Sequence, residues 1–219
     1  MTTLEARGVR SSAEGGSTPV VFAPPQGLPR RGRVRFVDMP PRRCLAIEGQ
    51  GPPGGAEFQG AVGALYSTIY ALHFLLRDRG IGTRIGPLEA LWERRDGSSA
   101  WLTGDFTTFD SEAWRWTALI EIPPEARDED TASAMAVARR KHPSPVLSRL
   151  VVMTLREGHA VEALHVGPYA TEPETLERMA AAATEAGVEP NGAHHEIYLG
   201  DPRRTAPDRL RTVLRQPVC

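Results

Sequence analysis

Cysteine is scarce in this chain of 219 residues, and the shortage excludes two kinds of small protein. Only Cys44 and Cys219 are present, so neither a disulfide framework nor a zinc site built from several cysteines can form. Disulfides persist in oxidising compartments, and a chain without them fits a reducing one. We therefore expect a cytoplasmic protein.

An excess of positive charge is also missing. The 26 basic and 27 acidic residues give a formal net charge of −1. A surface that holds nucleic acid or anionic lipid needs clustered positive charge, so we expect neither nucleic acid nor a membrane as a partner. No apolar run is long enough to cross a bilayer, and the N-terminus lacks the apolar core of a signal peptide. The composition predicts a soluble globular protein.

The common motifs of cofactor and metal binding are absent or unconvincing. Residues 49–54 match GxGxxG, but Pro52 and Pro53 remove two backbone N–H groups that a dinucleotide pyrophosphate would need. His194 and His195 are neighbours on a predicted strand, so they point to opposite faces and cannot chelate one ion. No Walker loop, GxSxG elbow, HExxH helix or paired CxxC occurs. We expect no cofactor and no metal.

Hydrophobic periodicity predicts an ordered domain after a disordered N-terminal tail. Residues 1–30 are rich in Gly, Ser, Pro and Ala and lack a regular period, whereas residues 31–219 alternate between helical and strand patterns. Apolar spacing predicts helices over residues 56–79, 130–141 and 172–186. Strands are predicted over residues 34–38, 44–48, 88–92, 114–122, 150–155, 160–166, 194–199 and 210–216.

The order strand-strand-helix-strand-strand occurs twice along the chain. The two repeat units span about residues 33–123 and 149–217 and are linked by the helix near 130–141. Gly51-Pro52 in the first unit corresponds to Gly167-Pro168 in the second. We predict an α+β fold, in which two pseudo-twofold-related βαββ units form one antiparallel sheet. Helices are expected on one face of the sheet and a ligand groove on the other.

Two carboxylates inside apolar strands are the most informative candidates for a site. Glu89 lies between Leu88 and Ala90, and Glu196 precedes Ile197. An unpaired carboxylate is costly to bury, so each must face water, a partner or a cavity. Aligning the repeats places the two acids at corresponding positions, and we expect both to face one aromatic-lined groove. The alternative is that both lie on a solvated face of the sheet.

Several sequence strings, taken together and in order, resemble the stand-alone GyrI-like small-molecule-binding proteins. These proteins are relatives of the effector-binding domains of AraC- and MerR-type drug-responsive regulators. The strings are PLEALW at 87–92, WRWT at 114–117, GPY at 167–169 followed by Glu172-Pro173, HHEIYLGDPR at 194–203 and LRTVLRQP at 210–217. The resemblance implies two pseudo-symmetric βαββ units. It also implies a groove that holds planar hydrophobic or cationic molecules around a glutamate, which falls on Glu196.

The resemblance leaves two functions open. As a multidrug-type binding module, the chain would capture lipophilic or cationic aromatic molecules as a monomer or homodimer. The candidate ligand-binding residues are Glu196, Glu89, Trp92, Trp116, Tyr66, Tyr70, Tyr169, Tyr198, Trp101 and His194. Some stand-alone members instead hydrolyse cyclopropane-bearing DNA alkylators and so confer antibiotic resistance, with a glutamate and a tyrosine that fall on Glu196 and Tyr169. We favour binding, because the catalytic roles rest on the resemblance alone.

Overall fold

Eight antiparallel strands form one sheet in the computed structural model, which describes residues 20–94 and 114–219. They lie in the order β1-β6-β8-β7-β3-β4-β2-β5. The strands are β1 Val34–Met39, β2 Arg42–Gln50, β3 Leu88–Arg94, β4 Trp114–Glu121, β5 Val151–Leu155, β6 Gly158–Val166, β7 His194–Tyr198 and β8 Arg211–Pro217. The predicted α+β fold with one antiparallel sheet is confirmed.

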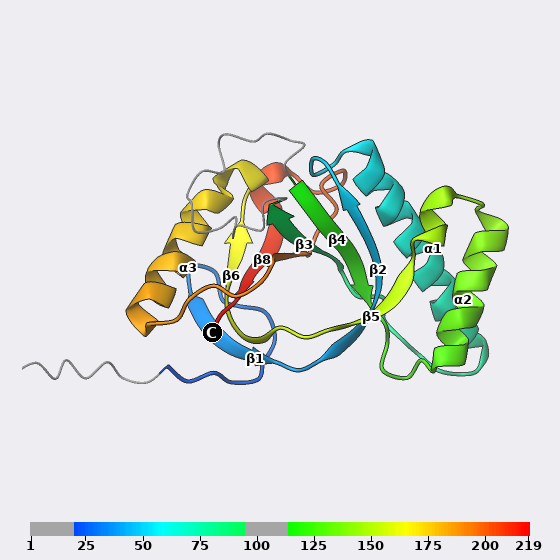
Figure 1. Ribbon diagram of the computed structural model, residues 1–219, viewed down its shortest axis with the longest axis horizontal. Helices are drawn as coiled ribbons and strands as arrows, with labels where there is room; N and C mark the ends of the chain where they lie inside the picture. Colours follow the sequence, from blue (N-terminus) through cyan, green and yellow to red (C-terminus); the bar gives the residue numbers. More distant parts are fainter. Residues whose placement is uncertain (1–19, 95–113) are drawn as a thin grey trace, which may run out of the picture.

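The described residues contain three α-helices, namely α1 Ala56–Asp78, α2 Asp128–Lys141 and α3 Glu172–Ala186. Helices α1 and α3 pack against the sheet, and α2 packs against α1. In Figure 1, α1 and α2 lie together at one end of the molecule and α3 lies at the other. Helix α3 ends at Gly187, whose φ of 68° is left-handed and suits glycine. Short 3-10 turns of the described part are η2 Pro145–Ser148, η3 Tyr169–Thr171 and η4 Pro207–Arg209. None of the described helices is long and apolar enough to cross a membrane.

The strand order has the symmetry that the repeat predicts. The unit β2-α1-β3-β4 occupies neighbouring positions on one side of the sheet, and β6-α3-β7-β8 occupies the other, with β3 and β7 paired at the centre. Ala90, Glu196 and Leu214 lie side by side across β3, β7 and β8. Ala90 packs in the core under α1, and Leu214 packs in the core under α3. Both helices therefore cover the same face of the sheet.

A continuous two-stranded ribbon connects the two units. Strands β1 and β2 follow each other along the chain, as do β5 and β6, yet β1 pairs with β6 and β2 pairs with β5. The antiparallel register runs without a shift from Val34 opposite Ala163 to Ala46 opposite Val151. The strand pairing is interrupted at residues 40–41 and 156–157, and the ribbon curves along the lower side of the view from β1 to β5 (Figure 1). Each unit thus supplies an edge strand to the other.

The predicted N-terminal tail is only partly described. Residues 1–19 lie outside the described residues, so disorder there stays a prediction. The chain from Val20 onward lies against the sheet, where Ala23 forms a parallel bridge with Val37. The ring of Phe22 stacks on His159 with centroids 4.0 Å apart. This segment adds to the core beside α3.

Candidate ligand-binding site

Glu196 lies in the middle of β7, at the centre of the sheet. Side chains alternate along a strand, so His194, Glu196 and Tyr198 project from the helix-bearing face, and His195 and Ile197 from the opposite face. The Glu196 side chain is 17% exposed and therefore reaches the surface without lying in open solvent. The expected groove lay on the face without helices, whereas the Glu196 group lies on the face that α1 and α3 cover.

Two hydrogen bonds in series hold Glu196 in place. The indole Nε1 of Trp92 donates to the hydroxyl oxygen of Tyr198 at 3.1 Å, and this hydroxyl donates to Oε2 of Glu196 at 2.7 Å. Burial raises the pKa of Glu196 to about 7, against the opposing effect of the Tyr198 hydrogen bond. Burial also raises the pKa of Tyr198, so its phenol remains a donor at neutral pH. Glu196 is therefore poised to gain or lose a proton near neutrality.

A second buried carboxyl group of this face belongs to Glu172, which the sequence reasoning did not identify as a site residue. Glu172 is the first residue of α3 and is 9% exposed. It lies near Thr212, which pairs with Tyr198 across β8 and β7 and whose side chain opposes the rise in the pKa of Glu172. Its Oε1 has no hydrogen-bond partner in the described residues. Burial, together with the charge of Glu196, raises the pKa of Glu172 well above its ordinary value.

The His194 imidazole lies next to Glu196 and stays neutral. Its Nε2 is 3.9 Å from Oε1 of Glu196, and its side chain is buried. Burial lowers the pKa of His194 to about 3, because a charged imidazole would lose its hydration. Neither ring nitrogen has a hydrogen-bond partner in the part of the chain that the structure describes. A neutral, unsatisfied donor and acceptor therefore stand beside the carboxylate.

Tyr169 lies at the open side of this group. It begins the turn η3 immediately before α3, and its ring meets that of Tyr198 edge-on with centroids 6.1 Å apart. The Tyr169 side chain is 39% exposed, more than any other member of the group described so far. Burial and the nearby Glu172 raise the pKa of Tyr169 to about 12, so this hydroxyl also remains a proton donor.

The candidate tryptophans of the described chain lie mostly in the core. Phe58 of α1 stacks on Trp92 at 5.4 Å between centroids and meets Trp116 edge-on at 5.1 Å. Both tryptophans are buried. A Cβ added at Gly49 would lie 2.3 Å from the Trp116 ring, so glycine makes room for this indole. Trp92 reaches the Glu196 group through its Nε1, whereas Trp116 supports Phe58. The predicted contact Trp101 lies outside the described residues.

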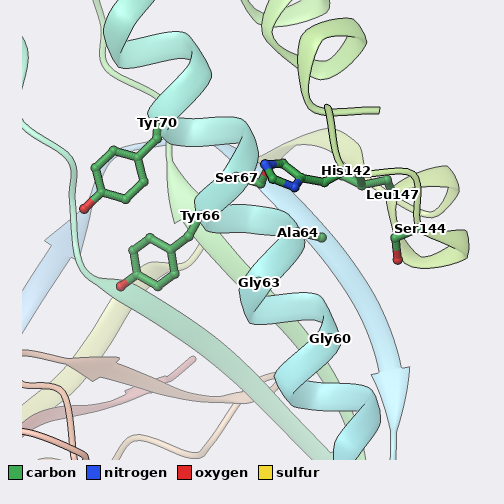
Figure 2. Close-up of a pocket in the computed structure, with 9 residues that line it drawn as sticks. All are labelled: Gly60, Gly63, Ala64, Tyr66, Ser67, Tyr70, His142, Ser144 and Leu147. Carbon is green, nitrogen blue, oxygen red and sulfur yellow. The ribbon is translucent and has the colours of Figure 1, made fainter. Parts of the chain in front are cut away.

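Tyr66 and Tyr70 line a separate pocket of about 410 Å³ along α1. Figure 2 shows their rings projecting from one side of α1, with His142 and Leu147 approaching the helix from the other side. No residue of β3 or β7 lines this pocket, so it does not contain the Glu196 group. The full lining is Gly60, Gly63, Ala64, Tyr66, Ser67, Tyr70, His142, Ser144 and Leu147.

Glu89 does not face Glu196, and the expectation that both acids face one groove is wrong. Glu89 pairs with Ile197, and Ala90 pairs with Glu196, so the two carboxylates leave the sheet on opposite faces. A shift of one residue along a strand moves a side chain to the other face. The repeat alignment was one residue out at this point, and the residue equivalent to Glu89 by face is His195.

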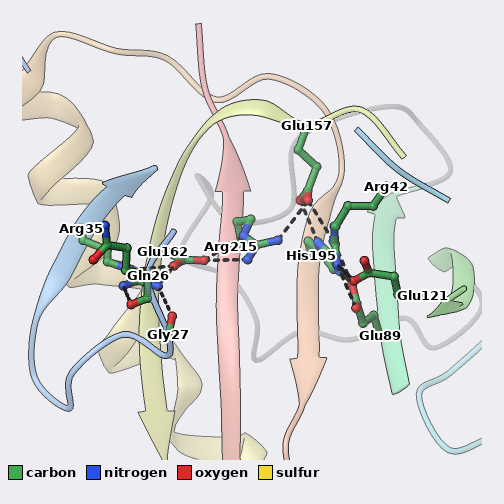
Figure 3. A network of polar contacts seen from close by, with 10 residues as sticks. All are labelled: Gln26, Gly27, Arg35, Arg42, Glu89, Glu121, Glu157, Glu162, His195 and Arg215. Carbon is green, nitrogen blue, oxygen red and sulfur yellow. Dashed lines mark hydrogen bonds and ion pairs between the residues drawn. The ribbon is translucent and has the colours of Figure 1, made fainter. Parts of the chain in front are cut away.

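Glu89 belongs instead to a buried ionic network on the face without helices (Figure 3). Arg42 donates to both oxygens of Glu89 at 3.1 and 3.0 Å. The His195 ring lies between Glu89, 2.9 Å from Nε2, and Glu157, 2.7 Å from Nδ1. Arg215 then bridges Glu157 to Glu162, which also pairs with Arg35. Because the charges of this network are paired with one another, we interpret the network as a structural element of the sheet.

Comparisons with known proteins agree with this fold. A model of the GyrI-like small molecule binding domain matches residues 119–218. An uncharacterized conserved protein from Listeria innocua is 31% identical in sequence, with a TM-score of 0.76 over 86% of this chain and 93% of that chain. The chain belongs to the GyrI-like family. A hydrolase encoded by lin2189 from Listeria innocua is also 31% identical, with a TM-score of 0.74 over 87% of this chain and 93% of that chain.

Two further comparisons add little beyond the GyrI-like fold. The EcmrR C-terminal domain has a TM-score of 0.55 over 85% of this chain and 97% of that chain, but only 9% sequence identity. That likeness supports the fold alone. A search of curated proteins gave no match.

The structure of this GyrI-like chain brings together five of the predicted site residues. Tyr169, His194, Glu196 and Tyr198 lie in one group, and Trp92 contacts it through a hydrogen bond. Glu172 joins them, although an acidic residue in the first turn of a helix is ordinary in sequence. Its position shortly after the GPY string, at the end of the turn η3, was the one available signal.

Proposed function

We propose that this chain binds cationic or aromatic small molecules at the group around Glu196. The observation that carries the proposal is a pair of carboxyl groups beside aromatic rings, the partly buried Glu196 and the buried Glu172. Within the described residues, neither has an ion pair with an arginine or lysine. Burying charge without a partner is unfavourable, so a ligand that brings a positive charge would relieve that cost.

The acids on the opposite face of the sheet differ from this pair. Glu89, Glu157 and Glu162 have side chains at most 3% exposed there, and each has at least one arginine partner within 3.2 Å. The fold therefore neutralises its structural carboxylates with arginine. The acids of the helix-bearing face lack such a partner in the described chain, which favours an external cation as their partner.

Aromatic rings supply the second part of the recognition. Tyr198 and Tyr169 meet edge-on beside Glu196, and the exposed part of Tyr169 gives a ligand access to the group. A cation over such a ring gains about 0.5–2 kcal/mol, more where water is excluded. Aromatic rings and carboxylates recognise the positive charge and planarity of a ligand rather than one particular molecular shape. We therefore propose lipophilic aromatic cations of several shapes as the ligand class.

Hydrolysis is the second candidate, and the proton affinity of Glu196 favours it. A carboxyl group with a pKa of about 7 is a suitable general base at neutral pH. In a cyclopropane-bearing DNA alkylator, water would attack a ring carbon and give its proton to Glu196. The ring C–C bond would break, its electron pair would move to the conjugated carbonyl oxygen, and Tyr169 would protonate that oxygen. The neighbour named as a hydrolase, at 31% identity, supports this reading.

Fluorescence titration with 10-methylacridinium, a planar cation without a dissociable proton, tests the binding proposal. Glu196→Gln keeps size and polarity but removes the charge, so the dye should bind about 10- to 100-fold more weakly, the scale of a charge-assisted hydrogen bond. Neutral anthracene-type probes should bind within about twofold of the parent chain. Glu177→Gln on the exposed side of α3 is the matched control and should change neither affinity. A wild-type chain that binds no cationic dye contradicts the proposal.

Mass spectrometry separates binding from hydrolysis. Incubated with a cyclopropane-bearing alkylator, a hydrolase should yield the ring-opened product with one added water. Glu196→Gln should then retain binding and lose turnover by orders of magnitude. A wild-type chain that binds the alkylator and returns it unchanged excludes hydrolysis of that substrate.

A further inference from the structure

We propose that His165 is a positioning residue of the Glu196 site, because it holds the turn that places Tyr169 beside Tyr198. The proposal rests on the proposed function, since it concerns the same site. The His165 side chain is buried on β6, so it acts through the turn η3 rather than by contact with a ligand. It assigns a role in ligand recognition to a histidine that the sequence motifs did not single out.

His165 lies in the same row of the sheet as Tyr198. His165 of β6 is opposite Thr212 of β8, and Thr212 is opposite Tyr198 of β7. Directly opposed residues project from the same face of a sheet, so the imidazole lies on the helix-bearing face. After β6 the chain turns through η3, where the ring of Tyr169 meets that of Tyr198 edge-on. The imidazole therefore lies on the same face of the sheet as the rings that it helps to place.

Both ring nitrogens of His165 are hydrogen-bonded. Nε2 lies 3.2 Å from the carbonyl oxygen of Pro168 and 3.3 Å from Oγ1 of Thr171, and Nδ1 lies 3.0 Å from Oγ1 of Thr175. A carbonyl oxygen only accepts, so the ring proton lies on Nε2, and Nδ1 accepts from the Thr175 hydroxyl. Burial lowers the pKa of His165 and so favours this neutral form. One ring thereby joins β6, the turn η3 and the first turn of α3.

The backbone around this contact has little freedom. The Pro168 carbonyl oxygen also accepts from the backbone N–H and from the hydroxyl of Thr171, both at 2.9 Å. Gly167 has a φ of 146°, and a Cβ added there would lie 3.4 Å from Nε2 of His165. The imidazole is therefore packed closely against the backbone that leads into Tyr169.

Tyr169 depends on this turn for its position. Its side chain makes no hydrogen bond to another described residue, and its ring contact is the edge-on one with Tyr198. The side chain is also exposed, so few neighbours restrict it. A side chain of this kind takes its place from its backbone. Loss of the His165 donor should let η3 shift and carry the Tyr169 ring away from Tyr198.

A similar contact between a histidine and a threonine occurs away from the site and provides a matched control. Nδ1 of His73 on α1 lies 3.0 Å from Oγ1 of Thr83, which is ten residues further along the chain, as Thr175 is from His165. His73 joins α1 to the segment before β3 and not to η3. His73→Leu therefore removes the same kind of hydrogen bond and should leave the dye affinity unchanged.

Titration with 10-methylacridinium in a double-mutant cycle tests the proposal. Tyr169→Ala removes a ring that a cation can lie over, so the affinity should fall by about 2- to 30-fold. His165→Leu removes the hydrogen bonds of the imidazole and should also weaken binding, by no more than Tyr169→Ala does. In the Tyr169→Ala background, His165→Leu should cause no further loss, because the residue that it positions is gone. His165→Gln can place an amide N–H near the position of Nε2 and should restore much of the affinity.

NMR supplies a readout that a change in stability alone would not move. The chain has four tyrosines, so selective labelling of tyrosine gives few ring signals to assign. Nuclear Overhauser effects between the rings of Tyr169 and Tyr198 should be present in the wild type and in His73→Leu, and they should be weak or absent in His165→Leu. Near-UV circular dichroism and urea unfolding check that each variant is folded under the conditions of the titration.

The outcomes distinguish this proposal from the proposed function. A dye that depends on Glu196 but binds equally well to wild type and His165→Leu overturns the positioning role and leaves the proposed function intact. An unchanged affinity in Tyr169→Ala overturns it as well, and so does an equal loss from His165→Leu with and without Tyr169. A dye that does not bind, or that ignores Glu196→Gln, contradicts the proposed function and this proposal with it.

Discussion

The Tyr198 hydroxyl donates a 2.7 Å hydrogen bond to Glu196 across two positions of the same strand. Both side chains project from the same face because they are two residues apart on β7. The same hydroxyl accepts from Trp92 on β3, so the orientation of Glu196 depends on a tryptophan more than a hundred residues away.

Tyr198→Phe should therefore raise the pKa of Glu196 further. The variant removes a donor to the carboxylate and leaves the Trp92 N–H without its acceptor, so we also expect a loss of stability of about 1–2 kcal/mol. Titration of the Glu196 carboxyl carbon by NMR checks the pKa, and urea unfolding checks the stability. A lower pKa in the variant would contradict the proposed hydrogen-bond effect.

The buried network predicts that stability falls as pH rises above neutrality. Burial opposes the charged form of His195, but Glu157 and Glu89 outweigh it and raise the pKa of His195 above its ordinary 6.5. The charged imidazole therefore contributes its full stability below about pH 6.5, and this contribution is lost as pH rises through the folded-state pKa. Urea midpoints between pH 6 and 9 should decrease in the wild type, with a weaker decrease in His195→Gln.

The same substitution tests the size of the network contribution. His195→Gln leaves Glu89 and Glu157 with less positive charge in a buried site, and breaking such a pair costs about 3–5 kcal/mol. Glu57→Gln, which breaks the half-exposed pair with Arg149, should cost less than about 1 kcal/mol. Equal losses in the two variants would mean that the network is not a structural element.

Acid should destabilise the protein through Glu157. Burial would raise the pKa of this carboxyl, but His195, Arg215 and Arg42 outweigh it and lower the pKa to about 2. A depressed folded-state pKa gives stability that is present above the unfolded value of about 4.5 and is lost as pH falls toward 2. The midpoint of thermal unfolding of the wild type should therefore fall from pH 5 to pH 2.5, and the midpoint of Glu157→Gln should fall less over the same range.

Substitution of glycine by alanine should change the stability in opposite directions at two positions. Gly49→Ala would place a methyl group 2.3 Å from the Trp116 ring, so overpacking should cost about 1–3 kcal/mol. Gly63→Ala lies within α1 with nothing within 4 Å of the added carbon, and it should stabilise the helix by about 0.5–1 kcal/mol. Urea unfolding of the two variants measures both signs. A neutral Gly49→Ala would show that Trp116 can move without cost.

Much of the fold could be predicted from the sequence because periodicity reports which side of an element is buried. The stripe of apolar residues on α1 and the glycine after α3 predict both helices, and the repeated order of elements predicts the paired units. The exchange of β1 and β5 between the units could not be predicted, since the sequence pattern of a strand does not specify the strand with which it pairs.

The site was harder to predict because it depends on the register of single residues. Glu89 and Glu196 look alike in their apolar strands, but a shift of one position separates them by the full thickness of the sheet. Glu157 and Arg42 lie in segments that resemble surface turns. They become buried partners only because β2 pairs with β5 of the other unit. Glu172 has the sequence context of an ordinary helix start. In each case, contacts between segments that are distant in sequence determine where the side chain lies.

The exchanged ribbon also bears on how such a chain arose and how it folds. A single βαββ unit with its leading strand would have one strand extended away from its own sheet, so two copies would complete each other as an interlocked dimer. Joining the copies in one chain turns that association into an intramolecular step. Pairing Val34 with Ala163 still requires closure of a loop of well over a hundred residues, which makes late and slow docking of the two halves the expected folding route.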